Sequence, residues 1–178
     1  MKRYTASIDT SLPIVAIDIG YSAQTASCAL AYSDMRETLI IQFGECIEKT
    51  RQLIDGKGKH TIILEAVLST YHRPDGNPDI RGNFEKGRGW YYGPGVSTFA
   101  AAIRFLQVLD QKLPEGIRPI PMVEGFLSYK KIHTQHADDA QRLLKEFYTA
   151  ERFKARSGSE RIISEIKGIP SIVRYNHP

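Results

Sequence analysis

Cysteine is scarce in this sequence, which contains only Cys28 and Cys46 among its 178 residues. The two cysteines do not form a Cys-x-x-Cys motif, so the sequence indicates neither a zinc-finger site nor a disulfide framework. Cys28 lies in an apolar stretch, where a small buried thiol is common. We therefore expect free thiols rather than a cross-linked or zinc-bound protein.

Long hydrophobic runs are also missing. No apolar stretch approaches the roughly 18 residues of a membrane span, and the first five residues are not followed by the apolar core of a signal peptide. Neither charge sign is in large excess, because 24 lysines and arginines face 20 aspartates and glutamates, a net charge of +4. This balance permits nucleic-acid binding without establishing it. We expect a reduced, cytoplasmic protein with no membrane partner.

The apolar pattern predicts three strands, a helix, a strand, a helix, a strand and a last helix. The first three strands are expected to be antiparallel, and the fourth, reached through a helix, to lie parallel to the first. With 42% apolar residues, residues 1–178 are enough for one well-filled core. The predicted strands cover residues 14–19, 25–32, 37–43, 61–67 and 117–129, and the predicted helices cover 46–54, 96–112 and a segment from about 137.

Two segments have no clear apolar periodicity. Residues 69–93 contain five glycines and two prolines, and a connection this long in a compact domain is usually functional or disordered. Residues 157–178 form a C-terminal extension that could add a short helix before the break at Gly168 and Pro170.

Acidic residues stand at the ends of three predicted elements. Asp18 ends the first strand, Glu65 ends the fourth, and the segment His136-Ala-Asp-Asp139 opens the last helix. Carboxylates crowded at the ends of buried strands cost free energy unless hard divalent cations with oxygen ligands compensate. The order of these motifs suggests a metal-dependent site for cutting phosphodiesters.

Two acidic positions in this pattern are ambiguous. His136 and Asp139 are three residues apart and share a helical face, whereas Asp138 points about 100° away. We therefore prefer Asp139 as the metal ligand and expect Asp138 to lie next to the ligand residues without binding the metal directly. Both could also be ordinary first-turn helix residues. Glu124 is expected on a strand beside Asp18, where it could be an extra ligand or, as we favour, a structural partner for a basic residue.

The element order resembles the ribonuclease H-like fold, an α/β fold with a mixed five-stranded sheet flanked by helices. Within it, Asp18, Glu65 and the His136–Asp139 segment resemble the active-site set of RuvC-type Holliday junction resolvases. These motifs extend from residue 14 to about residue 147. The sequence departs from the resemblance at Ala140 and Gln141, where relatives commonly place a further acidic residue and an Ala-Leu pair.

The resemblance implies a hydrolase of branched DNA that acts in recombination, binds two Mg²⁺ ions, with Mn²⁺ as a substitute, and works as a homodimer. Asp18 would bridge the ions, Glu65 and Asp139 would each favour one, and Asp138 would support them. His136 could ligate a metal or activate the attacking water. Carboxylate and water oxygens suit magnesium better than zinc.

Substrate contacts are expected from basic and aromatic side chains after Glu65. Such residues can contact phosphates and stack on exposed bases, although the aromatic run could instead anchor the loop to the core. Lys130 and Lys131, after the fifth strand, could face the same cleft or a solvated edge. The candidates within residues 69–93 are Arg73, Arg81, Lys86, Arg88, Trp90 and Tyr91.

Two other functions remain open on sequence alone. The altered motif Asp138-Asp-Ala-Gln141 would suit a nucleic-acid-binding module that kept the fold and lost catalysis. The motif Asp18-Ile-Gly-Tyr-Ser22 also resembles the first phosphate loop of actin-like ATP-binding proteins. That superfamily needs two such domains, for which 178 residues leave no room.

Overall fold

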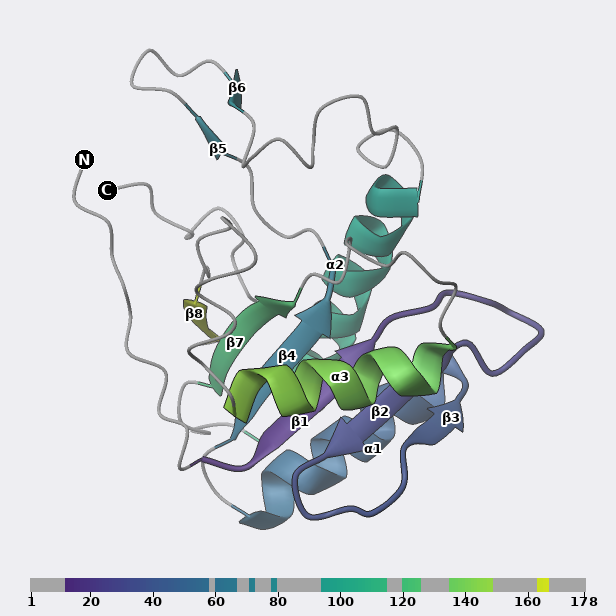
Figure 1. Ribbon diagram of the computed structural model, residues 1–178, viewed down its shortest axis with the longest axis vertical. Coiled ribbons are helices and arrows are strands. Elements are labelled where there is room, and N and C mark those ends of the chain that lie inside the picture. Colours follow the sequence, from purple (N-terminus) through teal and green to yellow (C-terminus); the bar gives the residue numbers. More distant parts are fainter. Residues whose placement is uncertain are drawn as a thin grey trace.

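The structure, a computed structural model, describes residues 12–57, 60–66, 71–72, 78–79, 94–114, 120–125, 135–148 and 163–166. Up to residue 148 its main elements follow the predicted chain order, and one further strand comes after them (Figure 1). They are β1 (Ile14–Asp18), β2 (Cys28–Tyr32), β3 (Leu39–Ile41), α1 (Phe43–Lys57), β4 (Thr61–Glu65), α2 (Pro94–Lys112), β7 (Ile120–Gly125), α3 (His136–Tyr148) and β8 (Ile163–Ile166). None of the helices in these described ranges is long and apolar enough to cross a lipid bilayer.

The strands form a mixed sheet in the order β3-β2-β1-β4-β7-β8. The first three strands are antiparallel to one another, and β4 lies parallel to β1, as predicted. β7 is parallel to β4, and β8 is antiparallel to β7. The α/β class is therefore confirmed.

Two segments differ from the sequence-based expectation. β8 adds a sixth strand where we expected a short helix, because the outer edge of β7 offers backbone groups with which an extended segment can pair. β5 (Tyr71–His72) and β6 (Pro78–Asp79) pair as a small hairpin within residues 69–93. Backbone pairing of this kind needs no apolar periodicity, so the sequence pattern gave no signal for it.

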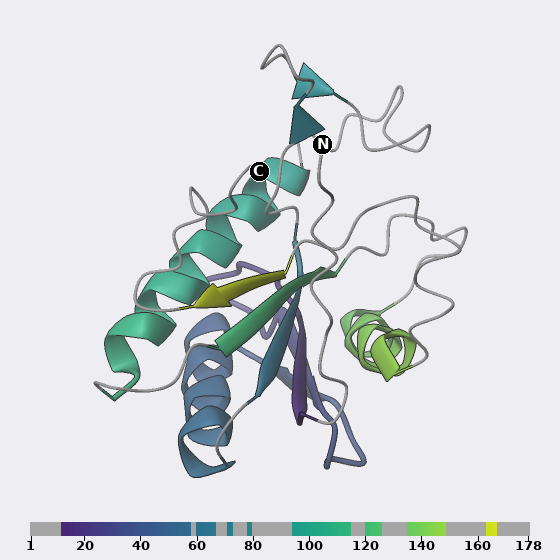
Figure 2. The ribbon, with the colours of Figure 1, turned by 90° about the vertical axis from the view of Figure 1, so that its left-hand side faces the viewer.

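The sheet separates the helices into two layers, with α1 and α2 on one face and α3 on the other (Figure 2). Alternate residues of β1 enter different cores because side chains alternate along a strand. Val15 and Ile17 belong to the core that includes α1 and α2. Ile14 and Ala16 belong to the core beneath α3.

The small side chains of the second face allow α3 to lie close to β1 and β2. Ala16, Ala29 and Ala31 are fully buried there. Three members of the predicted apolar stripe of α3 pack on them, namely Ala140, Leu143 and Leu144. The side chains of Phe147 and Tyr148, also predicted for this stripe, lie outside the described residues. The packing sets the position of α3 across the end of the sheet that carries the predicted acidic site.

The two cysteines, distant in sequence, meet in the core between β2 and α1. Both are buried free thiols that hydrogen-bond to each other. The interaction with Cys28, in which Cys46 keeps its proton, and then burial raise the pKa of the Cys46 thiol well above its ordinary value. The thiol of Cys28 also donates to the carbonyl oxygen of Gly20, at 3.1 Å. The pair therefore ties the connection after β1 to the core.

Glu48 links α1 to α2. Its carboxylate accepts a 2.6 Å bond from Nη2 of Arg51 and lies 3.4 Å from Nζ of Lys112. The hydrogen bond from Arg51, with smaller contributions from both cations, lowers the pKa of Glu48 to about 2. A carboxyl group whose pKa is lower in the folded state stabilises the fold above its unfolded pKa and loses that effect as pH falls towards the folded pKa.

We expect Glu48→Gln to be slightly less stable than the parent at pH 7, with a difference that shrinks from about pH 4.5 to about pH 2. The effect should be small and salt-sensitive because the site is exposed. Urea unfolding at several pH values measures it. Glu37→Gln, at an exposed loop position, is the control. A pH-independent difference for Glu48→Gln would contradict the assignment.

Candidate metal centre

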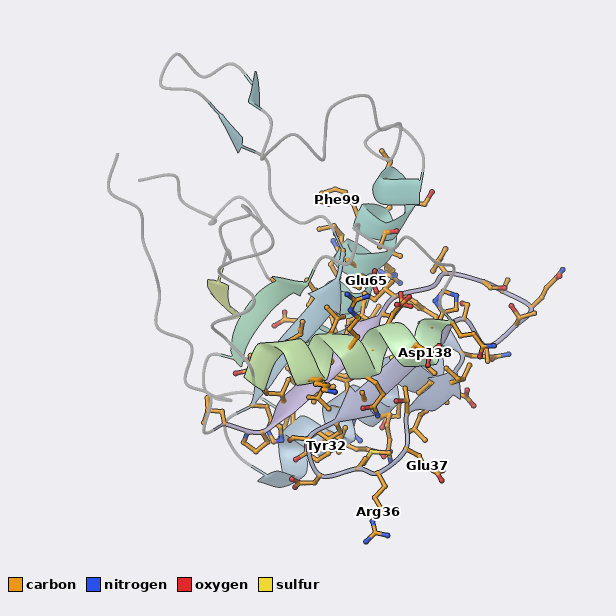
Figure 3. The ribbon with its side chains drawn as sticks, in the orientation of Figure 1. Tyr32, Arg36, Glu37, Glu65, Phe99 and Asp138 are labelled. Atoms are coloured by element: carbon orange, nitrogen blue, oxygen red, sulfur yellow. The ribbon has the colours of Figure 1, made fainter. Side chains whose placement is uncertain are left out.

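Asp18 and Glu65 are brought together by the register of two parallel strands. Asp18, the last residue of β1, is paired directly with Glu65, the last residue of β4. Residues paired in this way project from the same face of a sheet. Asp18 follows Ile14 and Ala16 in the alternation of β1, so both carboxylates belong to the face covered by α3. Figure 3 shows Glu65 next to α3, at the edge of the part of the sheet that this helix covers.

Asp139, in the first turn of α3, completes the group. One carboxylate oxygen from each of Asp18, Glu65 and Asp139 lies within 4.8 Å of the other two. Asp139 is 2% exposed and Asp18 is 7% exposed. The beginning of α3 contributes a partial positive charge that favours nearby anions. Three separate elements thus place three acidic side chains in one small, largely dehydrated volume.

The donor set fits a hard divalent cation. Two like unit charges about 5 Å apart repel by roughly 3 kcal/mol at an effective dielectric constant of about 20, so a group of three carboxylates, two of them buried, is correspondingly costly. Oxygen ligands from carboxylates are those that Mg²⁺ and Mn²⁺ prefer. A cation held by Asp18, Glu65 and Asp139 would remove this cost. The same set is not specific to magnesium.

His136 contacts the carboxylate group through Asp18. Its Nδ1 atom lies 2.6 Å from Oδ2 of Asp18, and its side chain is 54% exposed. An ionised carboxylate can only accept, so the hydrogen of this bond belongs to Nδ1. Nε2 of a neutral His136 then carries the free lone pair, which can take a proton. The geometry therefore suits His136 for orienting and moving a proton, whereas the three carboxylates make up the group of potential ligand atoms among the described residues.

The two adjacent aspartates of α3 have different surroundings. Asp138 is exposed near the start of the helix (Figure 3). Its Oδ2 accepts a 3.3 Å hydrogen bond from the backbone N–H of Gln135, while the carbonyl of Gln135 accepts from the N–H of Asp139. This is the return bond of a capping box. The structure thus places Asp139 in the carboxylate group and Asp138 in a helix-capping position.

Glu124 does not lie on a strand beside Asp18, which corrects our expectation. Its strand, β7, pairs with β4, and Glu124 is in register with Leu64 rather than with Glu65. The physical reason is that β2 already occupies the other edge of β1, so a strand reached through α2 adds beyond β4.

The predicted substrate-contact residues cannot be placed. Each lies outside the described residues, so their proposed contacts remain predictions. They are Arg73, Arg81, Lys86, Arg88, Trp90, Tyr91, Lys130 and Lys131.

Sequence reasoning missed two residues of the loop after β1. A Cβ atom at Gly20 would overlap the backbone oxygen of Ser27 and lie 2.7 Å from its carbonyl carbon. Tyr21, the next residue, is 73% exposed. A glycine two residues after a buried strand can signal close backbone approach, but the partner, Ser27, is visible only in the folded chain.

Comparison with known proteins adds no relative to this picture: no family model, curated protein or solved structure matches the chain. The functional interpretation therefore depends on the residues and on their geometry.

Proposed function

We propose that the protein is a magnesium-dependent endonuclease of ribonuclease H-like fold that hydrolyses phosphodiesters in branched or otherwise structured DNA. The observation that carries this proposal is the carboxylate group of Asp18, Glu65 and Asp139, assembled from two adjacent parallel strands and the start of a helix. The element order, with three antiparallel strands followed by alternating helices and strands, supports the fold assignment. DNA as substrate and action as a homodimer follow from the sequence resemblance.

Asp18, Glu65 and Asp139 would hold the divalent cations. Such ions, when bound, stabilise the charge that develops on the attacking and leaving oxygens of a phosphodiester. Asp18 also orients His136 through the 2.6 Å bond to Nδ1. His136 can then accept a proton from the attacking water at Nε2 and release it to solvent, because its side chain is half exposed.

The test is cleavage of labelled four-way junction, flap, duplex and single-stranded DNA with Mg²⁺ or Mn²⁺, with Asp18→Asn beside the parent. We expect the parent to cut only with metal and the variant to bind without cutting, since Asn removes one charged ligand. Equal cutting by the variant would refute the site. Binding without cutting by both proteins would instead favour the inactive nucleic-acid-binding module.

Metal binding should also stabilise the free protein. At a metal concentration of about 100 times the Kd, binding to the folded state alone contributes about 2.7 kcal/mol. For a domain of this size, that corresponds to a rise in Tm of about 5–10 °C. Thermal unfolding with added Mg²⁺ or Mn²⁺, then with excess EDTA, measures the shift.

Asp138→Asn and Asp18→Asn form the matched pair for this measurement. The first should keep the metal-dependent shift, because Asp138 caps the helix. The second should lose most of it. An equal shift in both variants would place the metal elsewhere in the protein.

A further inference from the structure

Tyr21 is an exposed aromatic ring held in place by the core. Its ring centroid lies 4.9 Å from that of Phe43, at an interplanar angle of 85°. Phe43 in turn makes an edge contact with Phe105, at 6.0 Å and 82°, and Phe105 is fully buried. A line of three rings therefore runs from the interior to the surface. Tyr21 remains 73% exposed, which is incompatible with both of its faces being covered.

Tyr21 lies close to the carboxylate group along the chain, with its ring on the side of the sheet that α1 and α2 cover. Tyr21 follows Asp18 by three residues, which limits their Cα separation to about 10 Å. The segment between them is fixed, because Gly20 packs on the backbone of Ser27 and accepts the Cys28 thiol. Adjacent bases of one strand rise by about 3.4 Å, so Tyr21 lies within a few nucleotides of a phosphodiester at the carboxylates.

The chemistry of the loop favours a base over a phosphate as the group that contacts Tyr21. Residues 19–33 contain no lysine, arginine, aspartate or glutamate. No acidic side chain of this segment would repel a polyanion, and no cation in it would attract a phosphate. The hydroxyl of Ser22 accepts from the backbone N–H groups of Gln24 and Thr25, so these donors are already engaged. The exposed face of Tyr21 is therefore the main surface of this segment that can recognise a ligand, and it can stack on the face of a nucleobase.

We propose that Tyr21 is a stacking platform for an unpaired base of the strand held at the carboxylate group. This inference rests on the proposed nuclease function and extends it to substrate selection. Bases within a continuous duplex are already stacked and paired, whereas those at a branch point, flap or single-stranded end can turn onto the ring. Tyr21 would therefore favour DNA with unpaired bases over plain duplex.

Tyr21→Phe and Tyr21→Leu separate the aromatic face from simple apolar bulk. The probe is a four-way junction that carries one 2-aminopurine, placed in turn at each position next to the branch, with Ca²⁺ replacing Mg²⁺ so that binding is measured without turnover. The parent and Tyr21→Phe should quench the fluorescence at one or more positions. Tyr21→Leu should lose the quenching and bind about 5- to 150-fold more weakly, the usual range for loss of one stacked base.

Cleavage of the same junctions with Mg²⁺ separates this inference from the proposed function. Tyr21→Leu should raise KM with a smaller effect on kcat, whereas Asp18→Asn should keep the quenching and lose cleavage. If Tyr21→Leu quenches the fluorescence and binds DNA as the parent does, the stacking site is refuted, while the proposed nuclease function is unaffected. Tyr21-dependent quenching by a parent that cuts nothing would support the stacking site and refute the nuclease. Loss of quenching in Tyr21→Phe, or no DNA binding by the parent, would also overturn the inference.

Discussion

Asp139→Asn is expected to slow metal-dependent DNA cleavage by about a thousandfold, whereas Asp138→Asn should cut at nearly the parental rate. The carboxylate of Asp139 lies with those of Asp18 and Glu65, but that of Asp138 caps the helix. Stabilisation of transition-state charge by bound cations is worth several kcal/mol, and about 4 kcal/mol corresponds to roughly a thousandfold in rate. Single-turnover cleavage at saturating protein measures this effect on the chemical step.

The two substitutions are closely matched, since each replaces one carboxylate oxygen by an NH₂ group, and the two residues are adjacent in α3. Asp138→Asn should cost at most about 1 kcal/mol of stability, because it alters a single helix cap. Junction binding measured with Ca²⁺ should persist in both variants. Similar losses of activity in the two variants would mean that cleavage depends on the structure of the helix start rather than on the carboxylate of Asp139. Loss confined to Asp138→Asn would reverse the assignment of the ligand.

Gly20→Ala is expected to destabilise the protein by roughly 1–3 kcal/mol, the usual range for overpacking a closely packed site. The added methyl group would overlap the backbone of Ser27, which cannot move aside as the end of a flexible side chain could. The strain would be relieved by moving the loop, and Asp18 lies only two residues away. A displacement of about 1 Å at a catalytic group can cost about a hundredfold in rate. Activity should therefore fall together with stability.

Gly44→Ala provides the control for this experiment. Gly44 lies in α1, and a Cβ atom there would meet nothing within 4 Å. Alanine in a helix is favoured over glycine by up to about 1 kcal/mol, so this variant should be slightly more stable than the parent and fully active. Urea unfolding and cleavage assays on both variants test the pair. A Gly20→Ala protein as stable and active as the parent would show that the loop after β1 can accommodate the methyl group at little cost in free energy.

The sequence predicted correctly those features that depend on the residue pattern within one short segment. The run 14–18 reads as a buried strand because its residues are continuously apolar up to Asp18. The beginning of α3 could be anticipated from its apolar spacing, and the three-residue spacing of His136 and Asp139 places them on one side of that helix. Periodicity and element ends are local properties, so Asp18, Glu65 and Asp139 could be singled out as a candidate group before their positions were known.

Contacts between distant segments were not accessible in this way. The small hairpin of β5 and β6 and the strand β8 arise from backbone pairing, which leaves little trace in side-chain pattern. The meeting of Cys28 with Cys46 and of Tyr21 with Phe43 depends on how α1 packs on the sheet. No spacing rule connects these residues, because each pair is joined only through the folded core.

By itself, then, the sequence determined the class of the fold, the order of the main elements from β1 to α3 and the acidic residues at their ends, since apolar periodicity and the type of the last residue are local properties of the chain. Only the tertiary structure decided which of these carboxylates meet. The register of β4 on β1 aligns Glu65 with Asp18, and the packing of α3 on Ala16 and its neighbours brings in Asp139. The same long-range pairing places β4 between the strand of Glu124 and the strand of Asp18. Register and packing are set by contacts between residues far apart in sequence, which a local pattern does not encode.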